Sequence, residues 1–231
     1  MHKNIAIIPA RGGSKRIPRK NIKDFLGKPI IAYSIELAIQ SGLFEEIMVS
    51  TDDDEIADIA IQYGASIPFK RSKENADDYA TLADVIEEVV KKYNDNGIHF
   101  NNFCCILPTS PLISTQQIKE AYMLLQNNKY TSVTPVVPFS YPILRSLKFD
   151  EDNYLSMVWP EYITSRSQDL STAYHDSGSF YWVNTNIFFK EKVLFTQDGT
   201  GIILNEMQVQ DIDNETDWKL AELKYTMLYA K

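Results

Sequence analysis

The chain has 231 residues, of which 23 are Lys or Arg and 31 are Asp or Glu, giving a formal net charge of −8 at pH 7. This length fits one α/β domain or one domain with a modest insertion, and the 44% hydrophobic content suffices for a substantial core. The acidic balance argues against nucleic acid as a partner, because polyanion binding requires many basic side chains. No apolar run approaches the roughly 20 residues of a spanning helix. The N-terminus enters a strand directly, so we expect a cytoplasmic protein without signal peptide or membrane partner.

A buried strand followed by a basic loop is expected at the start of the chain. Residues 5–8 form an unbroken apolar run, which is typical of a strand buried on both faces of a parallel sheet. Gly12 and Gly13 then let the backbone turn sharply and bring its amides close to a ligand, and Ser14 adds a hydroxyl. Residues 11–28 contain seven Lys or Arg and only one acid, a charge density that costs free energy unless an anion neutralises it.

This loop matches neither the dinucleotide fingerprint G-x-G-x-x-G nor the P-loop G-x-x-x-x-G-K-[ST]. A solvated basic surface loop is the simpler alternative. We favour a polyphosphate site, because a turn of amides surrounded by guanidinium and ammonium groups binds phosphate oxygens.

Strands and helices then alternate at about 30 residues per unit, which predicts an α/β fold with a parallel, doubly wound sheet. One helix is expected between Pro29 and Gly42, and a second one ends at Gly64. Thr51 and Asp52 precede the second helix, where such residues either cap it or contact a substrate. The strands expected in this part are residues 46–50 and 66–69.

The alternation continues to residue 137. A strand over 103–107 carries both cysteines as small buried hydrophobes, and it runs into the rigid turn 108–111. Ligands of open α/β sheets collect at such carboxyl ends of strands. The other elements expected here are a helix over 82–93, a helix capped by Ser114 and Gln117, and a strand over 132–137.

From Pro138 the regular alternation stops. Residues 139–179 are rich in aromatic residues, Pro and Ser, and we interpret them as an inserted arm, because a structureless loop of this length is unusual in a compact domain. Strand character returns at 180–190, and short strands are expected at 202–204 and 207–209. A closing helix from about Glu215 is expected to bury Trp218, Leu220, Ala221 and Leu223.

Two acids near the end of the chain supply a candidate metal site. Asp211 and Asp213 point to the same side of an extended segment, a spacing that suits a hard divalent cation. The alternative is that Asp213 caps the following helix and Asp211 is a surface acid. Together with a polyphosphate loop, the pair favours nucleoside triphosphate chemistry with Mg²⁺. The three histidines show no metal-ligand spacing, and His175 is either part of a polar pair or a substrate contact.

Five stretches together carry a resemblance to a known family: IIPARGGSKRIPRKN, GKPIIAYSIELA, VSTDDDEIA, PTSPL and DIDNETDW. They resemble the acylneuraminate cytidylyltransferases, also called CMP-sialic acid synthetases, over nearly the whole chain. The resemblance implies a Rossmann-like nucleotidyltransferase fold, with helices on both faces of a mostly parallel sheet and an arm that joins a homodimer. It also implies that CTP and an acidic nine-carbon 2-keto sugar react in the presence of Mg²⁺ and release pyrophosphate.

The resemblance assigns roles to individual residues. Catalysis is expected from Arg11, Lys15, Lys20 and Asp211, and the metal ligands are expected to be Asp211 and Asp213. The nucleotide is expected to contact Ala10, Arg11, Gly12, Gly13, Ser14, Lys15, Lys20, Asn21, Arg71, Ala80 and Thr81.

The chain differs from the sialic acid synthetases at positions that bear on the choice of sugar. Leu107 and Ile113 stand where that group commonly has Gln and Arg, and residues 167–182 resemble the pseudaminic acid branch of the family. Pseudaminic acid is therefore the expected substrate, with N-acetylneuraminic, legionaminic or 3-deoxy-octulosonic acid as alternatives and a non-catalytic nucleotide-binding module as another. Sugar contacts are expected from Leu107, Thr109, Ser110, Arg166, Tyr174, His175, Phe180 and Tyr181. The sugar carboxylate would need one basic partner, for which Arg145, Lys148 and Arg166 are the candidates.

Overall fold

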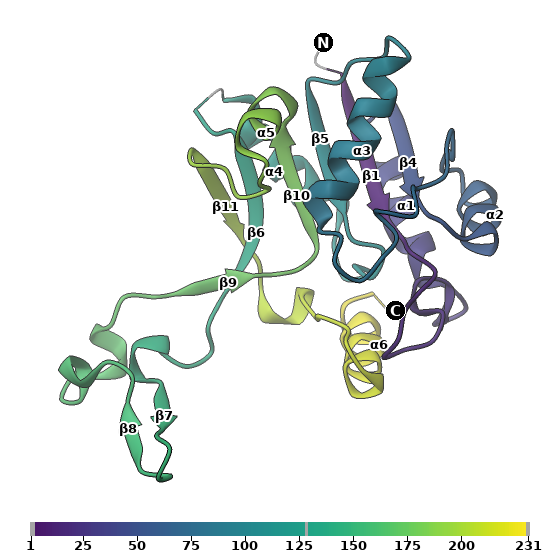
Figure 1. Cartoon of the computed structure of the whole chain (residues 1–231). Coiled ribbons are helices and arrows are strands. Elements are labelled where there is room, and N and C mark those ends of the chain that lie inside the picture. The colour runs from purple at the N-terminus through teal and green to yellow at the C-terminus, as the bar shows by residue number, and fades with distance from the viewer. Residues whose placement is uncertain (1–2, 128, 230–231) are drawn as a thin grey trace.

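The computed structural model describes residues 3–127 and 129–229, which form one α/β unit with a projecting arm (Figure 1). The main sheet has seven strands in the order β11-β6-β10-β5-β1-β4, and β9 pairs with β6 outside this path. The strands are β1 (Asn4–Pro9), β4 (Glu46–Ser50), β5 (Asn102–Ile106), β6 (Ser132–Pro138), β9 (Tyr174–Asp176), β10 (Phe180–Asn184) and β11 (Gly199–Ile203).

Parallel pairing brings the carboxyl ends of three strands together. Strand β1 runs parallel to both β4 and β5, so the carboxyl ends of these three strands lie at the same end of the sheet. Strand β10 lies antiparallel between β5 and β6, which gives a mixed but mostly parallel sheet. The expected doubly wound sheet is confirmed.

Helices cover both faces of the sheet. Ala6 and Ile8 of β1 pack into the core beneath α1, α2 and α4, whereas Ile5 and Ile7 pack into the core beneath α3 and α5. This is the alternation expected of a strand that is buried on both sides. The helices are α1 (Ile30–Ser41), α2 (Asp54–Gln62), α3 (Leu82–Asp95), α4 (Thr115–Gln126), α5 (Thr185–Glu191) and α6 (Glu215–Tyr229).

A third, smaller core joins the two ends of the chain. It contains Ile17 and Phe25 from the N-terminal segment together with Ile212 and Trp218 from the C-terminal one. Trp218 lies edge-on to Phe25, with ring centroids 5.5 Å apart. The short elements β2 (Asp24–Phe25), β3 (Lys28–Pro29) and the 3₁₀ turn η1 (Lys20–Ile22) complete this region.

Several local predictions are wrong. Residues 66–69 form no strand, and only Ser66 makes an isolated bridge, to Met48. The strand predicted over 180–190 ends at Asn184, because the Asn184 side chain accepts the amide of Ile187 and begins α5. Residues 206–208 form a 3₁₀ turn, η5, instead of a strand.

The closing helix begins at Glu215 as predicted, but it buries fewer residues than expected. Trp218 and Ala221 are buried, whereas Leu220 and Leu223 are exposed to 42% and 57%. Among the residues that the structure describes, no helix is long and apolar enough to cross a membrane.

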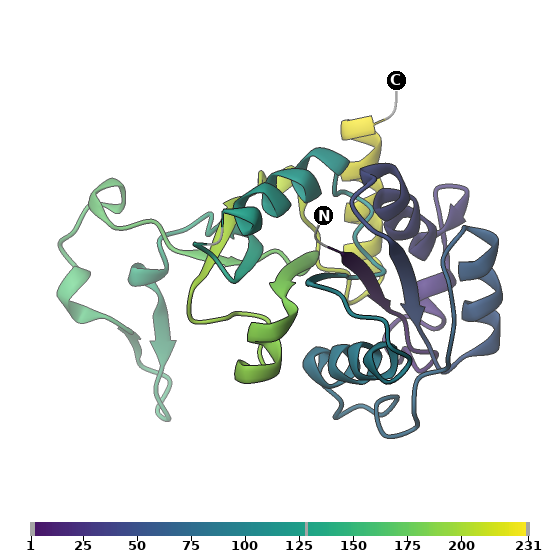
Figure 2. The ribbon, with the colours of Figure 1, turned by 90° about the horizontal axis from the view of Figure 1, so that it is seen from above.

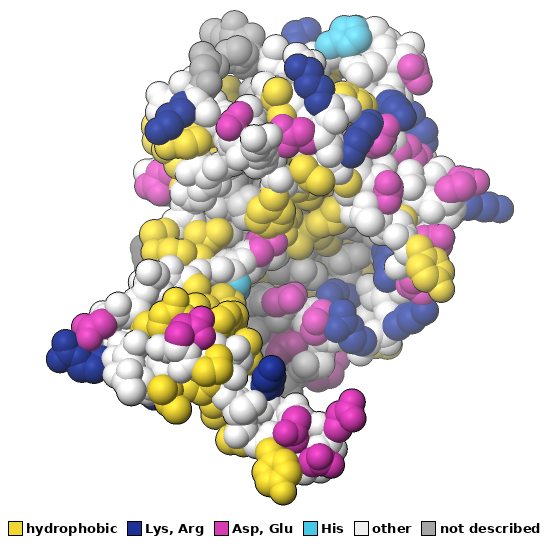
Figure 3. Space-filling view, turned by 60° about the vertical axis from the view of Figure 1, so that its left-hand side comes forward, with side chains coloured by type: hydrophobic (Ala, Val, Ile, Leu, Met, Phe, Trp, Pro, Cys, Tyr) yellow, Lys and Arg dark blue, Asp and Glu magenta, His cyan; other side chains and the backbone are white. Residues whose placement is uncertain are grey.

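The projecting arm consists of residues 139–173 and lies away from the sheet in both ribbon views (Figures 1 and 2). It contains a hairpin of β7 (Leu147–Phe149) and β8 (Leu155–Met157) and the 3₁₀ turns η2 (Ile143–Arg145), η3 (Pro160–Tyr162) and η4 (Ser167–Asp169). The arm was expected to span residues 139–179. It ends at residue 173, because the next residues form β9 and pair with β6. Figure 3 shows hydrophobic side chains gathered on it, and the exposed ones include Tyr141, Leu147, Phe149, Tyr154, Leu155 and Ile163.

Candidate active site

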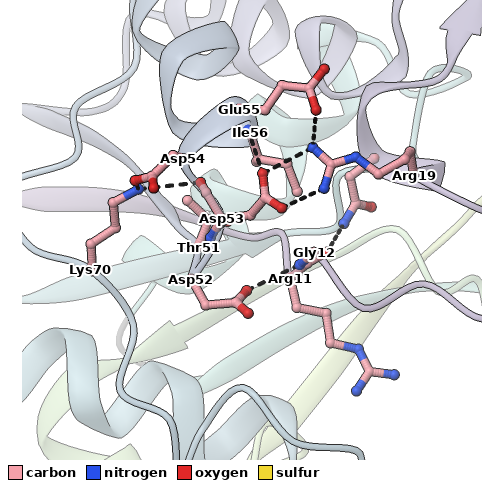
Figure 4. A network of polar contacts seen from close by, with 11 residues as sticks. Arg11, Gly12, Arg19, Thr51, Asp52, Asp53, Asp54, Glu55, Ile56 and Lys70 are labelled. Atoms are coloured by element: carbon pink, nitrogen blue, oxygen red, sulfur yellow. Dashed lines mark hydrogen bonds and ion pairs between the residues drawn. The ribbon is translucent and has the colours of Figure 1, made fainter.

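The basic loop (residues 11–23) is held by the turn that follows β4 (Figure 4). The amide of Ala10 donates to the carbonyl of Ser50 at 2.9 Å, and the amide of Gly12 donates to Asp52 Oδ1 at 3.0 Å. A Cβ atom on Gly12 would lie 2.7 Å from Asp53 Oδ2, so only glycine allows this close approach. The amide of Gly12 is therefore used within the protein.

The acids after β4 have structural partners. The N-cap of α2 is Asp53, whose side chain accepts the amide of Ile56. The two capping candidates from the sequence, Thr51 and Asp52, do not cap this helix. Arg19 adopts a left-handed φ of 55° and directs its guanidinium onto Asp53 and Glu55. The guanidinium lowers the pKa of Asp53 to about 2. Because Arg19 is paired with these two acids, it is not free to bind an anion.

A cavity of about 490 Å³ lies between the basic loop and the segment from Arg71 to Leu82. Its lining contains eight of the predicted nucleotide contacts: Arg11, Ser14, Lys15, Lys20, Asn21, Arg71, Ala80 and Thr81. Ala10 is fully buried beneath the loop, and neither Gly12 nor Gly13 lines the cavity. Of the predicted sugar contacts, Leu107 and Thr109 also line the cavity.

Arg71 is the most buried cation of the cavity, with 8% of its surface exposed. Its Nε donates to Ser50 Oγ at 3.1 Å and its Nη2 donates to the carbonyl of Ser50 at 2.6 Å. Loss of hydration lowers the pKa of Arg71, but a guanidinium remains charged at any physiological pH. Thr81 caps α3 in a capping box with Asp84, which fixes the backbone of residues 80–81 at the cavity wall.

The acid pair (Asp211 and Asp213) lies beside the basic loop. Lys20 Nζ donates to the carbonyl of Ile212 at 2.6 Å, and Arg16 forms a 2.7 Å ion pair with Asp213. Loss of hydration and the neighbouring charge of Asp213 raise the pKa of Asp211, whereas Lys20 opposes the rise. Loss of hydration lowers the pKa of Lys20, and both acids oppose that change.

The donor set of the acid pair fits a divalent cation that is shared with a polyphosphate. Within the described residues, no group of three or more His, Cys, Asp or Glu side chains could hold a metal ion. Mg²⁺ characteristically takes one or two carboxylates from the protein and completes its shell with water and substrate phosphates. Two carboxylates beside a basic loop provide this partial shell.

Part of the basic loop is paired with acids of the chain itself. Asp78 accepts from Arg11 at 2.8 Å and also pairs with Lys15, and both cations lower the pKa of Asp78. These side chains are solvent-exposed, so water and salt screen their attraction. One exposed carboxylate thus lies where several phosphate oxygens would fit, and a triphosphate with more charge can replace it.

The predicted sugar contacts are only partly brought together. Ser110 is buried and donates to the carbonyl of Ser179 at 3.1 Å, and Tyr181 lies on the same sheet face as Leu107. Phe180 has no exposed surface and packs in the core on the opposite face, so we assign it to the core and not to the sugar site. Arg166 pairs with Asp169 on the arm and does not line the cavity.

Strand β9 carries the two remaining sugar predictions. Tyr174 and His175 are both exposed there, and alternation along the strand directs them to opposite sides. The ring of His175 packs against Phe139, with centroids 5.0 Å apart.

The comparisons with known proteins agree with this architecture. A model of the cytidylyltransferase family matches residues 5–210. The chain belongs to the cytidylyltransferase family. It is therefore a nucleotidyltransferase, as expected from the five sequence stretches.

Two curated relatives span nearly the same length as this cytidylyltransferase. The pseudaminic acid cytidylyltransferase of Campylobacter jejuni subsp. jejuni serotype O:23/36 is 42% identical over 223 residues, which cover 96% of each chain. The CMP-N,N'-diacetyllegionaminic acid synthase of Legionella pneumophila is 34% identical over 227 residues, which cover 94% of each chain.

A solved structure supports the fold. CMP:2-keto-3-deoxy-manno-octonic acid synthetase, solved in complex with CTP, superposes with a TM-score of 0.67 over 98% of both chains at 17% identity. At that identity the likeness shows the shared fold of the two proteins and nothing about the sugar.

Sequence reasoning missed Asp78, which lines the cavity and pairs with Arg11 and Lys15 of the basic loop. It also missed that Asp52 orders this loop by accepting the amide of Gly12. The partners of both acids lie 40 or more positions away along the chain, and no local pattern carries such a signal.

Proposed function

We propose that this cytidylyltransferase transfers CMP from CTP to the anomeric hydroxyl of pseudaminic acid and releases pyrophosphate. The observation that carries the proposal is that a basic loop near the start of the chain lies beside an acid pair near its end. Arg16 and Lys20 line the cavity and also contact the segment that carries the acid pair. The choice of sugar is supported by the 42% identical relative, whose name specifies pseudaminic acid.

In this proposal, different cations of the cavity bind different parts of the nucleotide. Arg11, Lys15 and Lys20 offset the charge of the triphosphate and of the pyrophosphate that leaves, because all three cations line the cavity in which charge develops on phosphate oxygens. Arg71 and the backbone of Ala80 and Thr81 form the wall for the cytosine base, and their hydrogen bonds keep that wall in place.

Asp211 and Asp213 are the residues that would hold Mg²⁺. When bound, the ion supplies charge neutralisation at the α-phosphate and makes the sugar hydroxyl a better nucleophile. Lys20 lies between the cavity and the acid pair, so it holds the acids at a fixed distance from the phosphates. Ile212 points into the third core, which leaves the two flanking acids on the other side of the segment.

We further propose that two chains associate through the arm as a homodimer. The exposed apolar side chains of the β7–β8 hairpin have few neighbours within the chain, and a second copy would remove them from water. Phe149 and Leu155 oppose each other in the hairpin and are exposed to 69% and 55%. Replacing both by Ser should convert a dimer to a monomer in sedimentation experiments, and a wild-type monomer would refute this proposal.

The test of the function is a panel of acidic sugars. The purified protein is given CTP and MgCl₂ with pseudaminic, N-acetylneuraminic, legionaminic or 3-deoxy-octulosonic acid, and pyrophosphate release is measured. Fastest turnover with pseudaminic acid is expected. Faster turnover with another sugar would identify that sugar as the substrate of the same reaction. CTP binding without any pyrophosphate release would identify a nucleotide-binding module. We place the reaction in the cytoplasm, where CTP is available.

A further inference from the structure

Tyr181 and Asp176 form a hydrogen-bonded pair that the nucleotide chemistry does not use. Tyr181 of β10 is 5% exposed, and its hydroxyl donates to Asp176 Oδ2 at 2.5 Å. Asp176 Oδ1 accepts the amide of Gly178 at 2.9 Å, and Gly178 has a φ of +62°, a conformation that favours glycine. The carboxylate is therefore held at one oxygen by its own turn and at the other by β10.

The pair lies near the end of β5, where Leu107, a predicted sugar contact, lines the cavity. Tyr181 is in register with Cys105 on β5, and Leu107, two residues further along the chain, lines the cavity. The amide of Leu107 donates to the carbonyl of Ser179 at 2.8 Å, which joins the turn 176–179 to the end of β5. Tyr181 and Leu107 also pack in the same core cluster.

The acid pair lies within electrostatic range of Tyr181. Burial raises the pKa of the Tyr181 hydroxyl, and the charges of Asp176 and Asp211 raise it further. Tyr181 gives its single proton to Asp176, the acid at hydrogen-bond distance.

A carboxylate at this place needs a reason, because both expected substrates are anions. Asp176 is exposed, and its turn is joined to Leu107, a lining residue of the cavity, by the hydrogen bond from the Leu107 amide to the carbonyl of Ser179. An ionised carboxylate has about four acceptor positions, and Tyr181 and Gly178 use two of them. The remaining positions can only accept hydrogen bonds, which excludes the sugar carboxylate and favours N–H or O–H groups.

We propose that Asp176 is a specificity-determining residue that accepts a hydrogen bond from an amide N–H of the bound sugar, with Tyr181 as its positioning residue. Pseudaminic acid carries two acylamino groups, and each supplies such a donor. The proposal rests on the proposed function, and it goes beyond it in assigning one chemical contact of the sugar to Asp176.

The main test separates sugar recognition from nucleotide recognition. Asp176→Asn keeps the shape of the side chain but replaces one acceptor by a donor, so the KM for pseudaminic acid should rise at least tenfold. The KM for CTP should remain within twofold of the wild-type value. Asp58→Asn, an equal charge change at an exposed position of α2, should leave both constants unchanged.

A second measurement identifies the donor. Two substrate analogues are used, each lacking one of the two acylamino groups. For the analogue without the contacted group, wild type and Asp176→Asn should have the same kcat/KM, whereas they should differ for the other analogue. Tyr181→Phe should raise the KM for the sugar in the same direction, and thermal unfolding of each variant shows that it is folded.

The two proposals fail in different ways. A wild-type protein that releases no pyrophosphate with any sugar would overturn the proposed function, and the sugar contact with it. An active wild type with an unchanged sugar KM in Asp176→Asn would overturn the contact alone. Equal losses for both analogues would also overturn it, because they would show a structural role for Asp176.

Discussion

Lys20 and Ile212 lie 192 positions apart in the chain, and a hydrogen bond of 2.6 Å joins Lys20 Nζ to the carbonyl oxygen of Ile212. Ile212 has no exposed surface and packs with Ile17 of the basic loop. The third core therefore fixes the acid pair relative to the cations. We therefore expect the proposed metal binding at the acid pair and the proposed phosphate binding at the basic loop to be coupled, because the two segments share one core.

Replacing Asp211 by Asn should abolish turnover while leaving CTP binding nearly intact. The cavity cations that contact the triphosphate are unchanged in this variant, but a charged oxygen ligand of the proposed Mg²⁺ is lost. Loss of metal-assisted charge stabilisation corresponds to a fall in kcat on the order of 10³-fold. Steady-state kinetics and CTP titration measure the two effects separately. Asp198→Asn, at an exposed site, is the control, and a near-normal kcat in Asp211→Asn would remove the metal role.

Replacing Asp78 by Asn should strengthen CTP binding. Asp78 pairs with Arg11 and Lys15 in the ligand-free protein, and CTP has to displace it before its phosphates reach these cations. Because the pairs are exposed, the affinity should increase by up to about fivefold, and added salt should reduce the gain. Calorimetric titration at low and high salt measures this. Glu74→Gln, the same charge change in the same loop, should leave the affinity unchanged; weaker binding in Asp78→Asn would instead make Asp78 part of the site.

The basic loop and the acid pair could be proposed as sites from the sequence because their residue types indicate a chemistry. Seven cations in a short segment predict an anion site, and two acids two residues apart predict a metal site only in combination with it. Their proximity followed from the family resemblance, and the third core explains it physically. Asp78 escaped prediction, because its pairing with Arg11 depends on how the loop after Arg71 folds back.

Neighbouring residues with equal local propensity account for the other errors. Thr51, Asp52 and Asp53 are all good capping residues, and the choice of Asp53 depends on Arg19 and on the amide of Gly12, which takes Asp52. Phe180 and Tyr181 are both aromatic residues beside the site. Only the register of β10 with β5 decides that Tyr181 faces the cavity side and Phe180 the opposite core.

Gly12 and Gly13 form a matched pair for testing the basic loop. A Cβ at residue 12 would lie 2.7 Å from Asp53 Oδ2, whereas a Cβ at residue 13 has no neighbour within 4 Å. Gly12→Ala should therefore push Asp53 away from its position, lower stability by about 1–3 kcal/mol and weaken CTP binding. The free energy of unfolding of Gly13→Ala should lie within about 0.5 kcal/mol of the wild-type value. Urea unfolding measures both, and equal losses in the two variants would contradict the close approach at Gly12.

The ion pair between Arg19 and Asp53 should make stability depend on pH in the acid range. The pKa of Asp53 in the folded protein is about 2, below its ordinary value of 3.8, so folding favours the ionised form. The stabilisation is complete above about pH 4 and is lost as the pH falls through 2. Asp53→Asn retains a good N-cap but lacks the charge, so at pH 7 it should be less stable than wild type by roughly 1 kcal/mol, since Arg19 is partly exposed. Unfolding free energies of the two proteins should converge between pH 4 and pH 2. A difference that persists unchanged at pH 2 would show that the cost of the substitution comes from the cap and not from the charge.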